Sequence, residues 1–384
     1  MKKCLIILSL AMASLKGNAQ NSSPFTFRTE ITGDLISNMQ GGRKSGHSYV
    51  GKIDLSLGLS TEKAGWFKGG KLFLHAINAH GGNPSARYVG DIQPVSRIEA
   101  TNRISLFEFW YRQDIGKFSV LFGQFDMNST FAVNATAGNF LNTSFGMYPS
   151  IALNVPLSIY PYATPSLYAK WKHSEKLAFQ AAVFDGSPLK FQDNLNNLKW
   201  QIDAKKRLFS TFEIQMKEIK DSVVKGNYKI GGYYHNGDFR DVSDSSNSVN
   251  GSYGIYVTMD RLIIAENSAD NQGVTAFLQS GSSPGKINLV DFYLSTGLIY
   301  TGILPARSND ILSLGFVYSS INNYLHQAYP ISYTQSRSLI ELNYKAKFGN
   351  NFIVQPDLQY IINPGANPAF KNSLVGILRV SLVY

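Results

Sequence analysis

The C-terminal run KNSLVGILRVSLVY constrains the fold more than any other part of the sequence. Its apolar side chains recur at every second position and end on an aromatic residue: Leu374, Leu378, Val380, Leu382 and Tyr384. Arg379 and Ser381 occupy the other parity, as expected of a strand whose two faces meet lipid and water. Val375, Ile377 and Val383 interrupt the pattern, so this run alone does not establish a barrel.

The N-terminal segment has the features of a cleavable signal peptide. Two lysines precede an apolar run over residues 5–15, and the small residues Gly17 and Ala19 come just before Gln20. A membrane anchor is the alternative, but this run is far shorter than the roughly 20 residues of a spanning helix, and no other long apolar stretch exists. We expect residues 1–19 to be removed and the mature chain to begin at Gln20.

Composition favours a membrane barrel over a helical membrane protein. The chain is 44% hydrophobic and 16% charged. Its 21 Tyr and 24 Phe suit aromatic girdles at the two membrane interfaces, although a soluble all-β domain can be as aromatic. Cys4 is the only cysteine and leaves with the signal peptide, so the mature chain forms no disulfide.

The positive charge does not indicate nucleic-acid binding. Loss of the three lysines of the signal peptide lowers the net charge from +10 to +7, which is moderate for this length. Residues 205–207 form the only basic cluster. We expect the charge to lie in the loops and lumen of a barrel and no nucleic-acid partner to bind.

Strand-like runs recur along the whole mature chain, and we count 16. Most are close to the roughly 9 to 11 residues with which a tilted strand crosses the hydrocarbon layer, and an even count places both termini on one side. The predicted ranges are 25–37, 48–59, 70–79, 103–114, 117–126, 165–172, 176–185, 208–216, 226–235, 251–260, 272–279, 286–300, 311–319, 335–347, 350–362 and 371–384.

Several of these runs sort by parity into a lipid face and a lumen face. In the second run the predicted lipid face is Tyr49, Ile53, Leu55, Leu57 and Leu59, and the lumen face is Lys52, Asp54 and Ser56. In the fourteenth run Ile340, Leu342 and Tyr344 oppose Arg337, Glu341, Asn343 and Lys345. Other predicted inward positions carry both signs of charge, which suits neutral polar solutes: Arg28, Glu30, Asp357, Gln359 and Arg379.

The connections alternate between short turns and long loops, as in outer-membrane barrels. Short turns fall near Gly116, 173–176 and 349–351, and long Gly, Ser, Asn and Pro-rich stretches such as 80–102, 186–207 and 236–250 fall on the other side. The longest connection covers residues 127–164. A loop of this length is rarely structureless, so we expect it to fold into the channel and constrict it.

Four stretches in chain order resemble the carbohydrate-selective porin family, often called OprB-type porins: VSRIEATNRISLFEFWYRQ, LFGQFDMNSTFAVNATAGNFLNTSFG, AVFDGSP and QPDLQYIINPG. The resemblance implies passive diffusion of sugars across a Gram-negative outer membrane. Gln124 stands where the family more often has a basic residue, which bears on sugar preference, and Tyr384 stands where a terminal Phe is usual.

A sugar needs partners for its hydroxyls and aromatic surfaces for its apolar ring faces. The predicted constriction loop offers both, in Asn128, Asn134, Asn139, Asn142, Phe131, Phe140, Phe145 and Tyr148. Equally, these Asn side chains can cap turns and these aromatics can pin the loop to the wall. On the adjoining strand we expect Glu108, Trp110 and Arg112 to point inward, with Phe107, Phe109 and Tyr111 toward lipid.

The candidate pore-lining set adds the nearby charges before that strand and at the start of the loop. Arg97, Glu99 and Arg103 lie where the second long loop re-enters the wall, and they contact solute unless solvent or internal pairing satisfies them. The complete set is Arg97, Glu99, Arg103, Glu108, Trp110, Arg112, Asp126, Asn128, Asn134, Asn139, Phe140, Asn142 and Phe145.

No motif in the sequence indicates catalysis, a cofactor or a metal. His75 and His80 are the only close histidine pair and lack a third ligand of suitable type, and no serine stands out with a histidine and an acidic partner. We expect a transmembrane antiparallel β-barrel of about 16 strands, a porin in a Gram-negative outer membrane that passes sugars or similar small polar solutes.

Three alternatives stay open: a non-selective porin, a closed barrel with adhesive or catalytic outer loops, and a soluble secreted carbohydrate-binding β-protein. For the barrel we expect outer-membrane lipid and the outer-membrane assembly machinery as partners. A homotrimer is a further expectation for a porin of this size.

Overall fold

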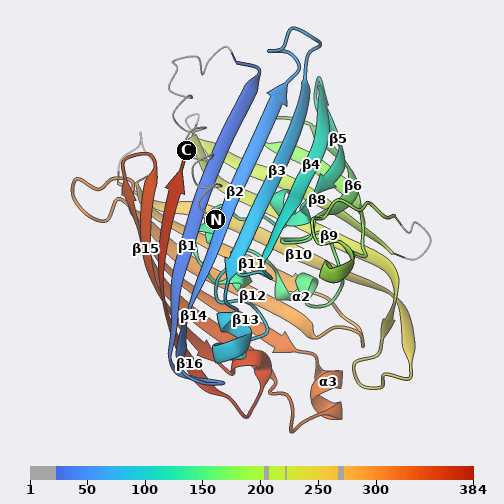
Figure 1. The fold of residues 1–384 in the computed structure, drawn as a ribbon, viewed down its shortest axis with the longest axis vertical. Coiled ribbons are helices and arrows are strands. Elements are labelled where there is room, and N and C mark those ends of the chain that lie inside the picture. The colour runs from blue at the N-terminus through green and yellow to red at the C-terminus, as the bar shows by residue number, and fades with distance from the viewer. Residues whose placement is uncertain (1–22, 203–206, 221–222, 267–271) are drawn as a thin grey trace, which may run out of the picture.

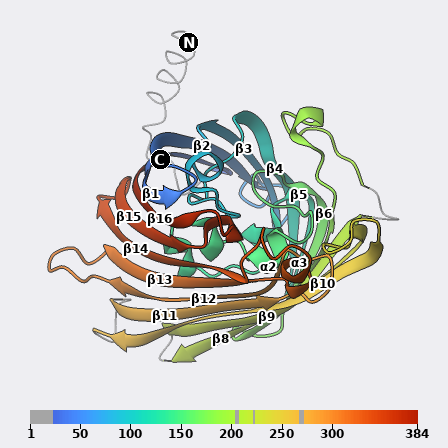
Figure 2. The same ribbon diagram turned by 90° about the horizontal axis from the view of Figure 1, so that it is seen from below.

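The chain forms a closed barrel of 16 antiparallel strands, in which each strand pairs with its chain neighbours and β16 closes the ring on β1 (Figures 1 and 2). The computed structural model describes residues 23–202, 207–220, 223–266 and 272–384. The predicted signal peptide therefore lies outside the described residues. Among the helices of the described ranges, none has the length and apolar character to span a membrane.

The strands are β1 Phe25–Gly42, β2 Gly46–Ser60, β3 Gly70–Gly81, β4 Arg103–Ile115, β5 Phe118–Phe125, β6 Thr164–Lys172, β7 Leu177–Asp185, β8 Leu208–Lys220, β9 Val223–Arg240, β10 Ser248–Ala265, β11 Gly273–Ser282, β12 Val290–Thr301, β13 Ile311–Ile321, β14 Ser336–Phe348, β15 Phe352–Ile362 and β16 Lys371–Val383. Short helical turns occupy the loops: η1 Ser85–Val89, η2 Met127–Ser129, η3 Ala137–Asn139, η4 Thr143–Phe145, α2 Pro149–Ala152, η5 Phe191–Asp193, α3 Asn323–Ala328 and η6 Pro364–Ala366.

The predicted fold is confirmed strand by strand. All 16 predicted runs overlap an observed strand in the same order. The largest differences are at β9 and β10, which have 18 residues each and extend beyond the predicted ranges 226–235 and 251–260 at both ends. The added residues are mainly polar at 236–240 and 248–250 and mainly apolar at 261–265, and cross-strand pairing rather than a regular hydrophobic alternation continues these strands.

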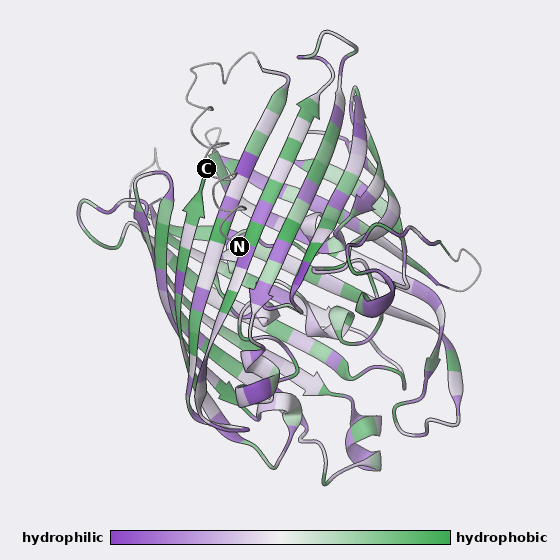
Figure 3. Cartoon of the chain, in the orientation of Figure 1, coloured by the Kyte–Doolittle hydropathy of each residue, from purple (hydrophilic) through white to green (hydrophobic). Residues whose placement is uncertain are grey.

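Side chains alternate between the outside and the inside of the wall, and Figure 3 shows this as alternating bands along the strands. On β2, Tyr49, Leu55 and Leu57 are exposed on the outer face, while Lys52 and Asp54 form an ion pair within the barrel. On β16, Leu378 and Val380 are exposed outside. The predicted lipid and lumen faces of these strands are therefore confirmed.

The two ends of the barrel differ in the length of their connections. The chain ends share one side, where the backbone amide of Thr29 donates to Tyr384 (2.9 Å), together with the short turns at 116–117, 173–176 and 349–351. The long connections 82–102, 126–163 and 186–207 leave the opposite side. Outer-membrane barrels have short periplasmic turns and longer outer loops, so the opposite side is extracellular.

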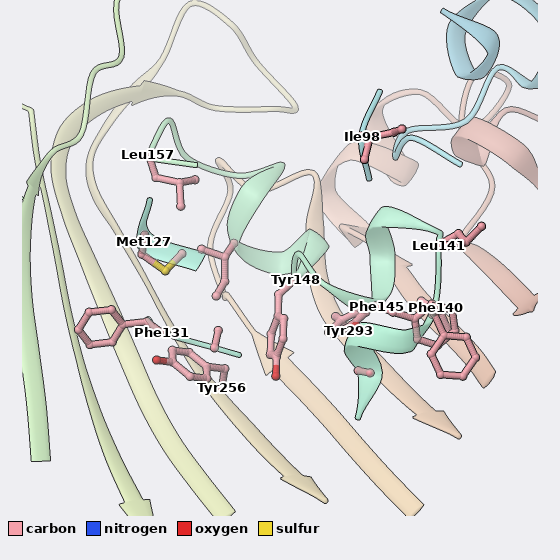
Figure 4. Packing of buried hydrophobic residues seen from close by; sticks show 14 of the residues in the cluster. Ile98, Met127, Phe131, Phe140, Leu141, Phe145, Tyr148, Leu157, Tyr256 and Tyr293 are labelled. Atoms are coloured by element: carbon pink, nitrogen blue, oxygen red, sulfur yellow. The ribbon is translucent and has the colours of Figure 1, made fainter. Parts of the chain in front are cut away.

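Two of the long loops, 82–102 and 126–163, turn into the barrel and pack against its inner wall (Figures 2 and 4). Phe131, Phe140 and Phe145 of the second loop are fully buried there, beside Tyr256 of β10 and Tyr293 of β12. Inward-facing apolar residues of the wall face the loops in the same core. Val375 and Ile377, which break the alternation of the last strand, belong to it, because loop side chains cover the lumen face at that height.

Candidate functional site

Two buried carboxylates of the wall hold the long loop 126–163 against the lumen face. Glu341 of β14 accepts the backbone amides of Leu141 (2.5 Å) and Asn142 (3.0 Å). Glu213 of β8 accepts the backbone amide of Ala132 (2.9 Å). Hydrogen bonds to a charged acceptor are the stronger kind, and they satisfy amides that would otherwise be buried without a partner. The sequence folds the loop inward because these strands place carboxylates where its backbone needs acceptors.

The loop 82–102 contacts two buried ion pairs, one through a serine hydroxyl and one through its own aspartate. Asp34 of β1 accepts hydrogen bonds from Nε and Nη2 of Arg379 of β16, each at 2.7 Å, and the hydroxyl of Ser96 donates to the same carboxylate at 2.6 Å. Asp91 pairs with Arg337 of β14, and the two side chains are 0% and 1% exposed. These contacts fix the loop to the β14 to β16 side of the barrel and to β1.

Four residues of the candidate set lie in the packing between loop and wall. The side chains of Phe140 and Phe145 are fully buried and stack on each other with ring centroids 4.1 Å apart (Figure 4). Asn134 donates to Thr258 (2.8 Å) and accepts from the loop backbone. Asn142 donates to Gln359 (2.8 Å). These contacts match the alternative interpretation, in which the asparagines cap turns and the aromatics pin the loop to the wall.

Three charged candidates, which lie in the loop 82–102 or directly after it, also make internal contacts. Arg97 donates to the carbonyls of Gly138 (3.2 Å) and Phe140. Glu99 accepts from the hydroxyl of Ser85 (2.6 Å). Arg103 is buried and its guanidinium lies between the rings of Tyr162 (4.4 Å) and Phe191 (4.5 Å).

Two loop asparagines keep part of their surface. Asn139 is half-buried and donates to the carbonyl of Thr136 (3.1 Å). Asn128 is also half-buried, and within the described ranges its side-chain amide has no hydrogen-bond partner. Of the loop residues in the candidate set, Asn128 is the one with a free amide.

On β4 the candidates Glu108, Trp110 and Arg112 face the lumen as predicted. The expectation that Phe107 faces lipid is wrong, because its side chain is only 6% exposed and packs inside with Ile77 and Ala163. The pairing of β3 with β4 shifts between His75 and Ala76, so a β-bulge at this point puts Phe107 and Glu108 on the same side.

A charged row on β1 to β4, directly below the loops, forms the polar part of the site. Lys52 and Asp54 pair at 3.0 Å, and His75 Nε2 lies 2.8 Å from the same Asp54 oxygen. The other His75 nitrogen lies 3.6 Å from Glu108. Lys52, Asp54 and His75 retain 15 to 20% of their side-chain exposure. A cavity of about 300 Å³ is lined by seven residues of β1 to β3: Arg28, Glu30, Lys52, Asp54, Ser56, Phe73 and His75.

Aromatic rings continue the site toward the periplasmic end. Phe73 of β3 and Trp110 of β4 stack with centroids 4.8 Å apart, and both face the lumen. They line a second cavity of about 290 Å³, which reaches Pro24 and Thr26 at the start of β1. Because Phe73 borders both cavities, the charged row and the aromatic pair form one continuous surface.

The opposite side of the lumen carries amides and lysines. Lys170 of β6 donates to Gln215 of β8 (2.7 Å), and Lys229 of β9 donates to the loop carbonyl of Val133 (2.6 Å). Asn227 donates to Asp260 at 2.9 Å. A solute in the lumen therefore meets ion pairs on one side and, on the other, lysines and amides that are hydrogen-bonded to acceptors including Asp260.

Sequence reasoning missed His75 as a member of the site, and it considered Lys52 and Asp54 only as lumen-facing positions. Their significance depends on the register of β2, β3 and β4, which places Asp54, His75 and Glu108 side by side. The sequence of a single strand does not show this register. His80 lies on the opposite face of β3, where its Nδ1 atom is hydrogen-bonded to Oδ1 of Asn78 (2.7 Å). In the described ranges no three His, Cys, Asp or Glu side chains form a metal-binding group.

Gln124 does not bear on the solute path. It sits on the outer face of the wall, where it donates to the carbonyls of Leu106 (2.9 Å) and Phe107 (3.1 Å) and accepts from the indole of Trp200 (2.7 Å). Its side chain is 1% exposed. The departure from the family pattern at this position therefore changes an outside contact and not the lumen.

Asp126 begins the long loop and gives the site a dependence on pH. Burial, together with the nearby Glu108 carboxylate, raises the pKa of Asp126 to about 8, although Lys52 and His75 act in the opposite direction. Its carboxylate accepts the backbone amide of Asn128 (2.8 Å). Since an unfolded aspartate has a pKa near about 4, the folded protein favours the protonated form.

The stabilising effect of Asp126 protonation is therefore complete below about pH 4 and is lost as the pH rises to about 8. Asp126→Asn keeps an oxygen for the Asn128 amide and removes the titration. We expect the wild-type thermal midpoint to fall between pH 5 and pH 8.5 by more than that of the variant, measured by heat-modifiable gel mobility. Equal falls in the two proteins would show that this carboxyl does not titrate as described.

Comparisons with known proteins agree with this architecture. The family model described as "Carbohydrate-selective porin, OprB family" matches residues 44–384. Porin B of Pseudomonas aeruginosa is 23% identical over 412 aligned residues, which cover 94% of this chain and 87% of that protein. The high-pH structure of OprB from Pseudomonas putida has a TM-score of 0.89 at 20% identity, covering 97% of each chain.

A more distant structure shares the fold alone. The outer membrane channel DcaP of Acinetobacter baumannii has a TM-score of 0.59 at 10% identity and covers 94% of this chain and 97% of its own. At such identities the solved structures support the barrel architecture, while the family match covers the loops and wall strands that build the site.

Proposed function

The chain belongs to the carbohydrate-selective porin family, and we propose that sugars cross its barrel along the inner wall of β1 to β4. The protein is a porin of a Gram-negative outer membrane. Passage through such a channel is diffusion down a concentration gradient. The proposal concerns which part of the lumen the solute follows and which residues distinguish a sugar from other small polar solutes.

The continuous surface from the charged row to the aromatic pair carries the proposal. A sugar hydroxyl both donates and accepts, and Lys52, Asp54 and His75 present donors and acceptors within about one sugar length. The apolar face of the ring stacks on an aromatic surface, which Phe73 and Trp110 supply directly below. Paired charges of both signs give no strong preference for cations or anions, which suits a neutral solute.

The position of the loop 126–163 along the far wall supports this path. Its anchoring contacts run along the far wall from Gln180 of β7 through Glu213 of β8 to Glu341 of β14. Toward β2 it presents Tyr160, whose ring centroid lies 5.1 Å from the Lys52 ammonium. We propose that this loop is the constriction and that Asn128, with its free amide, faces the solute.

Removing the aromatic pair should abolish the preference for sugars. Each stacking contact contributes about 1 kcal/mol, so Phe73→Ala together with Trp110→Ala should lower the ratio of glucose to amino-acid entry by up to roughly 30-fold. Liposome swelling with glucose and an amino acid of similar size measures this ratio. Trp171→Ala, on the outer face of β6, is the matched control.

Each outcome of the swelling experiment has a distinct meaning. A ratio that is unchanged in the double variant would contradict the aromatic path. Equal entry of glucose and amino acid in the wild type would favour the alternative of a non-selective porin. Absence of swelling would favour the closed barrel with functional outer loops.

The partners of the barrel are part of the same proposal. We expect outer-membrane lipid around its apolar belt, insertion by the outer-membrane assembly machinery, and association into homotrimers. The exposed terminal Tyr384 supports the expectation about assembly, since it ends an outward-facing apolar strand. The mass of the purified porin in detergent tests the trimer.

A further inference from the structure

Three neighbouring strands of the barrel wall are short, and the wall there ends early on the extracellular side. β5 has 8 residues and β6 and β7 have 9 each, whereas the other strands have 10 to 18. Eight residues at about 3.3 Å each, tilted by about 40°, span only about 20 Å, which is less than the apolar band of about 25 Å. The wall strands alone therefore do not cover the full hydrocarbon layer here.

As a result, the extracellular part of β4 has no neighbouring strand on its β5 side. β5 pairs with β4 only from Phe109 to Ile115, because the chain leaves the wall after Phe125 and enters the lumen. Over residues 103–108, β4 remains paired with β3 on one side but has no strand beside its other edge. In lipid an unpaired backbone amide or carbonyl costs several kcal/mol, so an open sheet edge is not tolerated at this depth.

Residues 194–202, which we call the wall segment, satisfy this edge from outside. The backbone amide of Leu106 donates to the carbonyl of Asn196 (3.0 Å), and the Asn196 side chain donates to the carbonyl of Ile104 (2.8 Å). The Asn197 side chain donates to the carbonyls of Leu106 (3.2 Å) and Ala163 (3.0 Å), which bridges β4 and the residue before β6.

The wall segment also reaches the middle of the wall. Trp200 donates to Gln124 (2.7 Å) and packs on Phe109, with ring centroids 6.4 Å apart. Phe109 is the central residue of the 13-residue strand β4. Figure 2 shows the connection between β7 and β8 outside the ring of strands rather than above its lumen. The segment therefore lies against the outside of the wall. Its position in the sequence, between two strands on the extracellular side, would instead suggest an outer loop in water.

The free surface of the wall segment is apolar. Leu195, Leu198, Trp200 and Ile202 are 51 to 65% exposed. From 198 to 202 these apolar residues alternate with Lys199 and Gln201, as in a strand at a membrane boundary. The surface continues the exposed belt of the wall at Ile104, Phe122 and Leu167.

We infer that the wall segment is embedded in the membrane, where it completes the short wall beside β4 to β6 and contacts the acyl chains of the outer leaflet. The occupant is lipid because the surface is continuous with the lipid-facing belt and lies on the extracellular half of the wall. Asn197 is the positioning residue, since its amide joins the two edges of the gap.

A polarity-sensitive fluorophore at single cysteines tests this inference. Cys4 is the only cysteine, so a chain expressed from Gln20 offers a clean background. The probe is attached at Leu198→Cys, and Leu167→Cys on the barrel belt and Lys190→Cys on the exposed part of the same connection are the controls. After refolding into liposomes, quenching by nitroxide-labelled acyl chains is compared with quenching by iodide in water.

The inference predicts that position 198 behaves as position 167, with strong quenching by the labelled lipid and weak quenching by iodide, and that position 190 shows the reverse. Asn197→Asp, which keeps the shape but removes both donated hydrogen bonds, should increase iodide quenching at position 198 several-fold. Iodide quenching at 198 equal to that at 190 would overturn the inference. Protection from both quenchers would also overturn it, because a second protein copy and not lipid would then cover the segment.

Discussion

Replacement of Glu341 by alanine is expected to release the long loop and enlarge the channel. The side chain is fully buried and accepts two loop amides, from Leu141 and Asn142. Hydrogen bonds to a charged group contribute about 1.5 to 3 kcal/mol each, so roughly 3 to 6 kcal/mol of loop docking is lost. We expect a several-fold rise in single-channel conductance and entry of sugars too large for the wild-type channel in liposome swelling.

Glu218→Ala is the matched control for this experiment. Glu218 is also a carboxylate of a wall strand, but it faces outward and pairs with Arg261 near the periplasmic end, away from the loop. Its loss should leave conductance unchanged. If Glu341→Ala folds and conducts as the wild type does, the loop is not the element that restricts the lumen.

The fold was predictable because each strand carries its own signal. Alternation on β2 and the length of the short turns define strands and sides without knowledge of distant contacts. The end of β5 could be placed within one residue for the same reason. The extensions of β1, β8, β9 and β10 went unpredicted, because cross-strand pairing continues these strands over residues that show no regular hydrophobic alternation.

The packing inside the barrel was partly visible in the sequence. Val375 and Ile377 interrupt the alternation of β16 at the height where loops fill the lumen. An apolar residue on the lumen face of a water-filled channel is unfavourable, so such interruptions indicate the depth to which loops enter. This signal is local, and it could have been used to separate the packed upper lumen from the open lower lumen.

The members of the site were harder to predict because they depend on register. Asp54, His75 and Glu108 become neighbours only when β2, β3 and β4 are aligned. The bulge that turns Phe107 inward shows in its own strand only as a change of the outward positions from even numbers at Ile104 to odd numbers at Phe109. Asparagines and aromatics of the loop attracted attention by composition, yet Asn142 and Phe145 serve the loop backbone and core. Composition identifies the loop that enters the barrel but not which of its residues remain free.

Replacement of Arg337 by alanine is expected to lower the stability of the protein strongly, because the side chain belongs to a buried ion pair. Arg337 and Asp91 are almost completely buried, and Asp91 also accepts the backbone amide of Gly365 (3.1 Å). The Arg337 guanidinium donates further to Ser144 (3.0 Å), so the pair ties together three outer loops. Removing one partner of a buried pair leaves an uncompensated charge, which costs about 3 to 5 kcal/mol.

The double variant Arg337→Met with Asp91→Asn separates the lost charge from the lost packing. Asparagine keeps an acceptor for Gly365, and methionine fills much of the arginine volume, so no buried charge remains. Neutral replacement of a buried pair is often tolerated, and we therefore expect the double variant to unfold at a higher temperature than Arg337→Ala. Heat-modifiable gel mobility measures both midpoints. Equal midpoints would mean that the stability lost in Arg337→Ala comes from packing, and that the charge of Asp91 has little effect on how the loops are held.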